Sequence, residues 1–193
     1  MENKKIRVGF VICGSFCTIA KAIESIEALQ NAGYEVLPIM SDTAYATDTR
    51  FGAAADIIAK IENLTQKKII HTIEAAEPIG PKKLCDILII APCTGNTLGK
   101  LAGGITDTAA TMATKSHLRG GNPVLIALAT NDGLGASAQN IAALKNTKHI
   151  FFVPIRQDDC IEKPNSLVAD FDLLIPSIED ALQGKQSQPF FVV

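Results

Sequence analysis

The feature that most constrains the fold is a regular alternation of short apolar runs with longer stretches in which apolar residues recur every three or four positions. Short runs of this kind are typical of strands buried on both faces, and the recurring pattern is typical of helices that pack on one side. The expected strands lie at residues 6–12, 35–40, 86–90, 123–128 and 149–154. Such a succession predicts a single-domain, three-layer α/β/α Rossmann-like fold with a mostly parallel sheet and right-handed crossovers.

Between the strands, the pattern predicts helices and polar loops. The first helix carries Ile19, Ile23, Ile26 and Leu29 on one face and ends at Gly33. Ser15 and Ser137 are expected to cap helices. Further helices are expected around residues 57–64 and over 95–102, 108–118, 138–145 and 177–182. Loops are expected at 41–52, 74–81, 131–137 and 157–166, and short strands at 68–73 and 172–175.

Length and composition limit the class of protein. A chain of 193 residues, 47% of them hydrophobic, fits one domain over residues 1–193. The net charge of −2 gives no reason to expect nucleic acid or an anionic membrane as a partner, and the apolar runs are too short to span a bilayer. No cleavage signal precedes the first predicted strand, so we expect a cytoplasmic protein.

The five cysteines are an odd number and lack the spacing of a zinc or iron–sulfur site. We therefore expect free thiols and no metal, with Cys13 and Cys85 in the core. Cys93 differs because it lies within residues 86–107, where a buried strand ends in Ala-Pro and is followed by Cys93-Thr94-Gly95-Asn96-Thr97. Its thiol is either reactive toward a ligand or a small apolar filler.

A turn at the carboxyl end of a parallel strand is where open α/β sheets bind ligands. The small and hydroxyl residues after Pro92 leave backbone N–H groups free to meet an anion or a flat polar ring. This segment therefore predicts a cofactor site.

A second turn, Gly14-Ser15-Phe16, follows the first predicted strand and opens a helix, where free N–H groups can hold a phosphate. The segment has neither the lysine of a P-loop nor G-x-G-x-x-G, so a monophosphate fits better than a triphosphate or a dinucleotide. The alternative is a tight turn and a helix cap only. Ser41 and Thr43 follow the second strand, as a third ligand-facing turn or as an ordinary polar turn. These turns would converge if their strands are neighbours.

Residues 91–107 resemble the Pro-Ala-Ser-Ala-Asn-Thr…Ala-Lys…Gly-Ile…Asp signature of the homo-oligomeric flavin-containing cysteine decarboxylase superfamily. The resemblance implies bound flavin mononucleotide (FMN) and a homo-oligomer that is a trimer or a multiple of one. It also implies a set of residues that bind the cofactor. By resemblance, the phosphate side comprises Gly14, Ser15, Phe16, Ser41 and Thr43, and the ring or ribityl side comprises Pro92, Cys93, Thr94, Asn96 and Thr97.

The chain also departs from that superfamily. The decarboxylases have a histidine about eight residues before the central strand, whereas the nearest upstream histidine here is His71, fifteen residues before Asp86. Their Pro-x-Met-Asn-x-x-Met segment is replaced by Ala129-Thr130-Asn131-Asp132. We therefore expect His71, His117 and His149 to be surface or structural residues, and decarboxylation of a cysteinyl peptide is not favoured.

Stretches at 77–83, 91–97, 104–107, 129–135 and 163–170 resemble one branch of the superfamily, which belongs to a sporulation enzyme built from two kinds of chain. The resemblance implies flavin-linked oxidation of a dihydro- or hydroxytetrahydro-precursor to pyridine-2,6-dicarboxylate, in the cytoplasm of the mother cell. It implies a partner chain that resembles nicotinamide-binding dehydrogenases and brings NAD(P). No catalytic residue is assigned.

A dicarboxylate needs cations or N–H donors. Asn131 stands where the decarboxylases read a substrate carboxylate, and Lys100, Arg119 and Arg156 are further candidates, or else ordinary surface charges. Asp107 is expected either to cap the helix at 108–118, which is favoured, or to face the flavin. Two other functions stay open. The chain is a non-catalytic component that binds flavin or stabilises its partner, or it is a flavin-dependent decarboxylase or prenyltransferase.

Overall fold

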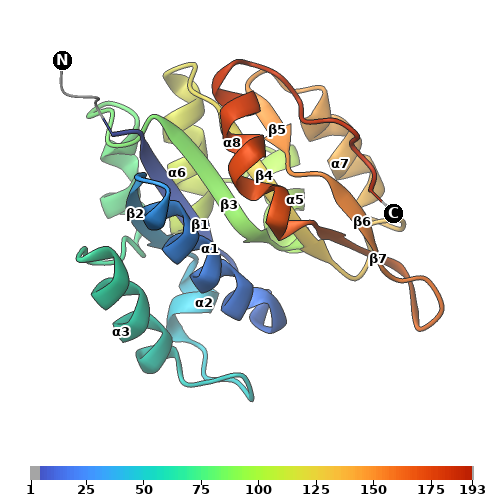
Figure 1. The fold of residues 1–193 in the computed structure, drawn as a ribbon, viewed down its shortest axis with the longest axis horizontal. Helices are drawn as coiled ribbons and strands as arrows, with labels where there is room; N and C mark the ends of the chain where they lie inside the picture. The colour runs from blue at the N-terminus through green and yellow to red at the C-terminus, as the bar shows by residue number, and fades with distance from the viewer. Residues whose placement is uncertain (1–4, 193) are drawn as a thin grey trace.

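The computed structural model describes residues 5–192, in which seven strands form one sheet in the order β2-β1-β3-β4-β7-β6, with β5 also paired to β4 (Figure 1). The first five strands run parallel, and β7 is antiparallel to both β4 and β6. The strands are β1 Arg7–Ile12, β2 Glu35–Met40, β3 Ile87–Cys93, β4 Val124–Thr130, β5 Ile150–Phe152, β6 Ile155–Asp159 and β7 Lys163–Ala169. The predicted mostly parallel α/β sheet is confirmed.

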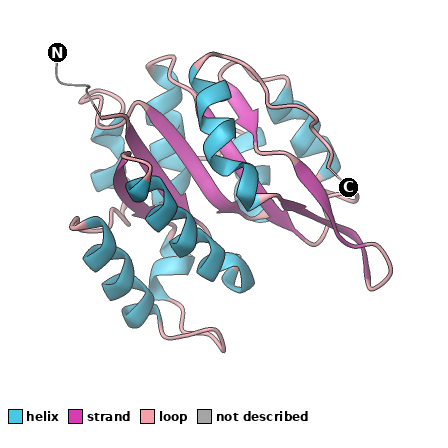
Figure 2. Cartoon of the chain, in the orientation of Figure 1, coloured by secondary structure: helices cyan, strands magenta, loops and turns pink. Residues whose placement is uncertain are grey.

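Helices cover both faces of this sheet, which confirms the three-layer arrangement. Figure 2 shows α1 and α8 in front of the strands and α6 and α7 behind them. The helices are α1 Ile19–Asn31, α2 Asp42–Ala46, α3 Ala54–Thr65, α4 Ile73–Ala76, α5 Gly95–Ala102, α6 Ala109–Arg119, α7 Ala138–Lys145 and α8 Leu174–Leu182. Single 3₁₀ turns stand at Phe16–Thr18, Glu77–Ile79 and Phe171–Leu173.

The core lies where the apolar runs predicted it. Every residue of β3 is buried, because β1 and β4 flank it in the sheet and helices cover both of its faces. The predicted stripe of α1 is buried against the sheet, and the helix ends before Gly33, whose φ of 90° favours glycine. No helix between residues 5 and 192 combines the length and apolar character needed to cross a bilayer.

The structure corrects three of the local predictions in the first half of the chain. The expected loop at 41–52 contains the short helix α2, capped by Ser41, whose Oγ accepts from Ala44 N at 3.3 Å. The expected loop at 74–81 contains the end of α4 and a 3₁₀ turn. Residues 68–73 form no strand, only a single bridge between Ile70 and Ile39.

The largest correction concerns the expected loop at 157–166, which is the hairpin β6–β7 that projects from the sheet (Figure 1). The Asp159 carboxylate stabilises its turn by accepting from Ile161 N and Glu162 N, both at 2.9 Å. The expected strand at 172–175 is also wrong, because these residues lie in a 3₁₀ turn and the start of α8. This hairpin matters because it reaches the carboxyl end of β4.

Candidate functional site

The three turns expected to converge do follow neighbouring strands, since β1 lies between β2 and β3. Backbone hydrogen bonds join them: Cys13 N donates to Pro92 O at 3.2 Å, and Ser41 N donates to Ile12 O at 3.0 Å. The chain leaves β1 toward β2 on one side and later returns to β3 on the other, which makes this edge a topological switch point. A crevice at such a point is the usual ligand site of an open α/β sheet.

A cavity of about 810 Å³ opens at this edge. Its volume falls within the range of small-molecule sites. Its walls are the turn after β1, the start of α5, the turn after β4 and the β6–β7 hairpin. The lining residues are Gly14, Ser15, Phe16, Cys17, Thr18, Lys21, Arg50, Phe51, Thr94, Gly95, Ala129, Thr130, Asn131, Arg156, Gln157, Asp158, Lys163, Ser166, Leu167 and Val168.

The first wall is the turn at residues 14–18. Ser15 was predicted to cap a helix, but its side chain makes no capping bond; instead Ser15 Oγ accepts from Thr18 Oγ1 at 2.7 Å. Within residues 5–192, the backbone N–H groups of Phe16 and Cys17 have no hydrogen-bond acceptor. Unsatisfied N–H groups at the start of a helix attract anions. The turn also lies against α2, because a Cβ on Gly14 would stand 3.5 Å from Thr43 Cγ2.

The second wall is the start of α5. Thr94 caps this helix, with its Oγ1 accepting from Thr97 N at 3.2 Å. Gly95 follows, and a Cβ there would stand 2.5 Å from Thr130 Oγ1 and 2.9 Å from Asp132 Oδ1. Only a glycine lets α5 approach the end of β4 this closely, so the two walls stand in a fixed relation.

The third wall, the turn after β4, is held by Asp132. Its Oδ1 accepts from Thr130 Oγ1 at 2.5 Å and from Ser137 Oγ at 2.8 Å, and these hydroxyls lower the pKa of Asp132. Ser137 was predicted to cap α7, but its hydroxyl bonds Asp132 and makes no cap. With Asp132 bound to its neighbours, Asn131 is left exposed on the cavity wall.

Three cysteines are buried: Cys13 and Cys93 behind these walls, and Cys85 at the opposite, amino edge of the sheet. Burial raises the pKa of Cys13 to about 11 and of Cys85 to about 12, and it raises the pKa of Cys93 well above its ordinary value. Protonated, buried thiols are weak nucleophiles. Of the two interpretations of Cys93, this geometry favours the small apolar filler. The prediction that Cys13 and Cys85 are buried is confirmed, while Cys17 and Cys160 are exposed.

The structure separates the predicted cofactor residues into two groups. The cavity wall includes Gly14, Ser15, Phe16, Thr94 and, of the substrate candidates, Asn131 and Arg156. The others lie behind or beside the wall. Ser41, Pro92, Cys93 and Thr97 are buried, while Thr43 and Asn96 are exposed outside the lining.

Two substrate candidates and one predicted cap lie elsewhere. Lys100 is paired with Asp107 at 2.9 Å, and Arg119 ends α6; neither lines the cavity. Asp107 does not cap α6 as predicted. Thr108 caps it, in a reciprocal arrangement with Thr111.

Several cavity residues were given no role from the sequence, among them Cys17, Lys21, Arg50 and Lys163. A signal was available for the first two, since both follow the Gly14 turn within the next two helical turns. Arg50 and Lys163 had no such signal, because they reach the cavity from segments that were expected to be loops.

The histidines lie outside the cavity lining. His117 is fully buried, with Nδ1 3.5 Å from Cys85 Sγ and Nε2 3.2 Å from Pro123 O, and burial lowers its pKa to about 4. His71 stacks on Tyr45, with ring centroids 3.7 Å apart. Between residues 5 and 192, no three His, Cys, Asp or Glu side chains are grouped as metal ligands.

Comparison with known proteins identifies relatives of the whole chain. A family model described as Flavoprotein matches residues 1–182. The B subunit of dipicolinate synthase from Bacillus subtilis (strain 168) is 46% identical over 186 residues, which cover 96% of this chain and 93% of that protein.

Solved structures agree with the sequence relatives. The crystal structure of the B subunit of dipicolinate synthase from Bacillus halodurans C superposes with a TM-score of 0.89 at 41% identity, covering 97% of this chain and 96% of the other. The FMN-dependent cysteine decarboxylase SpaF has a TM-score of 0.64 at 23% identity, over 92% and 95% of the two chains, which shows a common fold.

Proposed function

Because this chain belongs to the flavoprotein family, we propose that it binds FMN at the carboxyl edge of its sheet and acts as the B subunit of a dipicolinate synthase. The observation that carries the proposal is the 810 Å³ cavity, where the turns after β1, β3 and β4 meet. Function lies in sites rather than in folds, so the cavity and the likeness to dipicolinate synthase count for more than the shared architecture.

The cavity residues fit a flavin phosphate. The unsatisfied N–H groups of Phe16 and Cys17 and the hydroxyl of Ser15 suit a monophosphate, and Gly14 leaves the backbone accessible. Thr94 offers a hydroxyl from the second wall toward the ring or ribityl chain. Ser41 and Thr43 support the phosphate turn from α2, while Pro92, Cys93, Asn96 and Thr97 shape the second wall.

The reaction we propose is oxidation of a dihydro- or hydroxytetrahydro-dipicolinate to pyridine-2,6-dicarboxylate. The dihydro compound loses two hydrogens, as a hydride and a proton, and the hydroxytetrahydro compound also loses one water. The electrons pass to a flavin or to NAD(P)⁺ bound by the partner chain, the A subunit. A bound flavin supplies an acceptor for a hydride or for single electrons. This chain's residues bind the substrate, orient it and exclude water, with Asn131 donating to a carboxylate. We further propose a homo-oligomer, a trimer or a multiple of one, in the mother-cell cytoplasm of a sporulating bacterium.

One experiment tests the cofactor site without measuring activity. Cys17 lines the cavity and is exposed, whereas Cys160 is exposed on the hairpin outside the lining. We expect saturating FMN to slow alkylation of Cys17 at least tenfold and to leave Cys160 unchanged, as read by mass spectrometry of peptides. Equal rates at Cys17 with and without FMN, or no visible flavin absorption after desalting, would show that the cavity is not the flavin site.

A charge variant separates the phosphate turn from the fold. Ser15→Asp places a carboxylate where the phosphate is proposed, and we expect it to abolish FMN retention. Thr72→Asp is the matched control, because Thr72 caps the remote helix α4 and aspartate is also a good cap. If both variants retained FMN, the phosphate of FMN would not lie at the turn that contains Ser15.

The catalytic role requires a second experiment. Dipicolinate formation by the purified A and B subunits should fall sharply when this chain is omitted. Full turnover without it would favour the alternative, a chain that binds flavin or stabilises its partner without chemistry. Release of carbon dioxide from a cysteinyl peptide by the isolated chain would instead favour a decarboxylase.

A further inference from the structure

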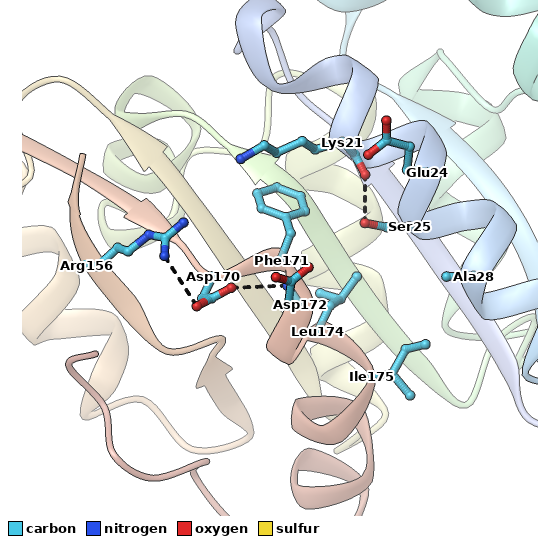
Figure 3. Close-up of a pocket in the computed structure, with 10 residues that line it drawn as sticks. All are labelled: Lys21, Glu24, Ser25, Ala28, Arg156, Asp170, Phe171, Asp172, Leu174 and Ile175. Carbon is cyan, nitrogen blue, oxygen red and sulfur yellow. Dashed lines mark hydrogen bonds and ion pairs between the residues drawn. The ribbon is translucent and has the colours of Figure 1, made fainter. Parts of the chain in front are cut away.

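A second hollow of about 350 Å³ adjoins the main cavity, between α1 and the segment that leads into α8 (Figure 3). The two hollows have Lys21 and Arg156 in common, so these residues mark the boundary between them. In Figure 3 the ammonium group of Lys21 and the guanidinium group of Arg156 extend from opposite sides toward one gap, beside the ring of Phe171. This boundary therefore offers two cations and an aromatic ring.

Charge in the lining of the main cavity is unbalanced. Four cations line the main cavity, Lys21, Arg50, Arg156 and Lys163, against the single carboxylate of Asp158. Asp158 is committed to Lys163 at 2.7 Å. Within residues 5–192, Lys21 and Arg50 form no ion pair. Uncompensated cations around one concavity concentrate anions there.

Arg156 is held in place without being neutralised. Its Nη1 lies 3.7 Å from Asp170 Oδ2, while the other oxygen of Asp170 accepts from Asp172 N at 3.2 Å. A guanidinium has five N–H donors, and this single long contact leaves most of them available. The Arg156 side chain is 46% exposed. Asp170 thus orients the side chain and leaves a planar set of donors able to bind a carboxylate at two points.

We infer that Lys21 and Arg156 bind the two carboxylates of a flat aromatic dicarboxylate, with the ring of Phe171 beside it. The inference rests on the proposed function for the identity of the substrate. The hollow beyond the pair is lined by the carboxylates of Glu24 and Asp172, which repel an anion and confine it to the boundary. This hollow runs along α1 from Lys21 to Ala28, away from Gly14.

The direct test is isothermal titration of the full chain, without flavin, with pyridine-2,6-dicarboxylate. We expect Arg156→Gln and Lys21→Gln each to raise the dissociation constant about tenfold or more. Arg119→Gln and Lys115→Gln are the matched controls, because both residues are exposed on α6 outside the cavity, and we expect no more than a twofold change. Pyridine-2-carboxylate should bind more weakly to the unchanged protein and lose less affinity on either substitution.

The same variants distinguish substrate from cofactor. We expect the dissociation constant of FMN to stay within twofold in Arg156→Gln and Lys21→Gln. If FMN affinity falls and dicarboxylate affinity does not, the pair serves the phosphate and the inference is overturned. It is also overturned if the unchanged protein does not bind the dicarboxylate, or if all variants bind it equally.

Arg156→Lys serves as a control for correct folding, because it keeps the charge beside Asp170 but loses the planar guanidinium. We expect this variant to lose less affinity for the dicarboxylate than Arg156→Gln does. If this variant lost affinity as fully as Arg156→Gln, that result would contradict a charge-dependent site. Failure of the proposed function would give a different result. The chain would not retain FMN, or turnover would not depend on it, while dicarboxylate binding would still depend on Lys21 and Arg156.

Discussion

The two edges of the sheet use polar groups in opposite ways. At the amino edge they are paired within the protein: Asp86 receives three hydrogen bonds from Arg7, at 2.7–3.2 Å, and His117 is enclosed between Cys85 and Pro123. At the carboxyl edge, cations and backbone N–H groups face a cavity with few internal partners. Polar residues at the first edge therefore hold the fold, and those at the second are available to a ligand. The difference predicts that substitutions at the amino edge change stability and those at the carboxyl edge change binding.

The largest effect is expected from Gly80→Ala at the amino edge. A Cβ at this position would overlap the backbone carbonyl oxygen of Ser116, whose Oγ accepts from Gly80 N at 2.9 Å. Because neither backbone can shift alone, we expect the free energy of unfolding to fall by about 3 kcal/mol in urea titrations. Gly99→Ala in α5 is the control, since the new Cβ would stand 3.4 Å from Asn140 Nδ2 and alanine favours a helix. If the two variants were equally stable, the expected difference between the two edges of the sheet would not hold.

The next largest effect on stability is expected from lowering the pH, through protonation of His117. Its pKa is lowered to about 4 in the folded protein, against roughly 6.5 when unfolded, so the unfolded state takes up the proton first as pH falls. The free energy of unfolding should decrease between these two values, by up to about 3 kcal/mol, and the contribution of His117 should be constant below them. Urea titrations from pH 7 to 4 would measure it. His117→Gln should be less stable at pH 7 yet show a flatter profile, and an unchanged profile would exclude His117 as the cause.

At the carboxyl edge, Thr94→Val removes the cap of α5 and leaves Thr97 N without its acceptor. Loss of such a cap costs about 1 kcal/mol. Thermal or urea unfolding should show this modest loss, while Thr94→Ser retains the hydroxyl and most of the stability. A loss as large as that of Gly80→Ala would mean that this edge also holds the fold.

The smallest change in stability is expected from Ser15→Ala, within about 0.5 kcal/mol, because Ser15 Oγ bonds only the nearby Thr18 hydroxyl and Cys17 thiol and makes no cap. FMN affinity should nevertheless fall, by roughly tenfold for one hydrogen bond to a charged phosphate. Fluorescence titration of FMN alongside urea unfolding separates the two quantities. A stable variant with full FMN affinity would remove Ser15 from the site.

The carboxyl edge was predictable from sequence because its turns follow strands buried on both faces. The runs at β1, β3 and β4 are apolar apart from Arg7 at the start of β1 and Thr130 at the end of β4, so both the strands and the positions of Gly14, Thr94 and Asn131 at their ends could be predicted directly. The order of the strands, which brings these turns together, was a conditional expectation that the topology confirms. Their binding of a flavin is still a prediction.

The hairpin could not be predicted in the same way. Arg156, Gln157 and Asp158 are exposed in β6, and β7 begins with three exposed residues, so neither strand shows the apolar pattern of a buried sheet. Its local signal was the aspartate at position 159, which closes the turn through its carboxylate. Missing the hairpin also hid the positions of Arg156 and Lys163 in the cavity lining, because the other walls of the cavity come from segments that are distant in sequence.

The pairing of β4 with two different strands has a consequence for how such a site can diversify. β5 pairs with the first half of β4, and β7 takes over along the same side at Ala129 and Thr130. The first half of β4 therefore pairs with another parallel strand, while the β6–β7 hairpin pairs with its carboxyl end and forms one wall of the cavity. The base of this hairpin is tied to the turn after β4, because Leu134 N donates to Asn165 O at 3.0 Å and Ser166 Oγ donates to Thr130 O at 3.2 Å. Its tip has no such bond to a strand-end turn among the described residues, so we expect changes at the tip to be tolerated by the frame of the site.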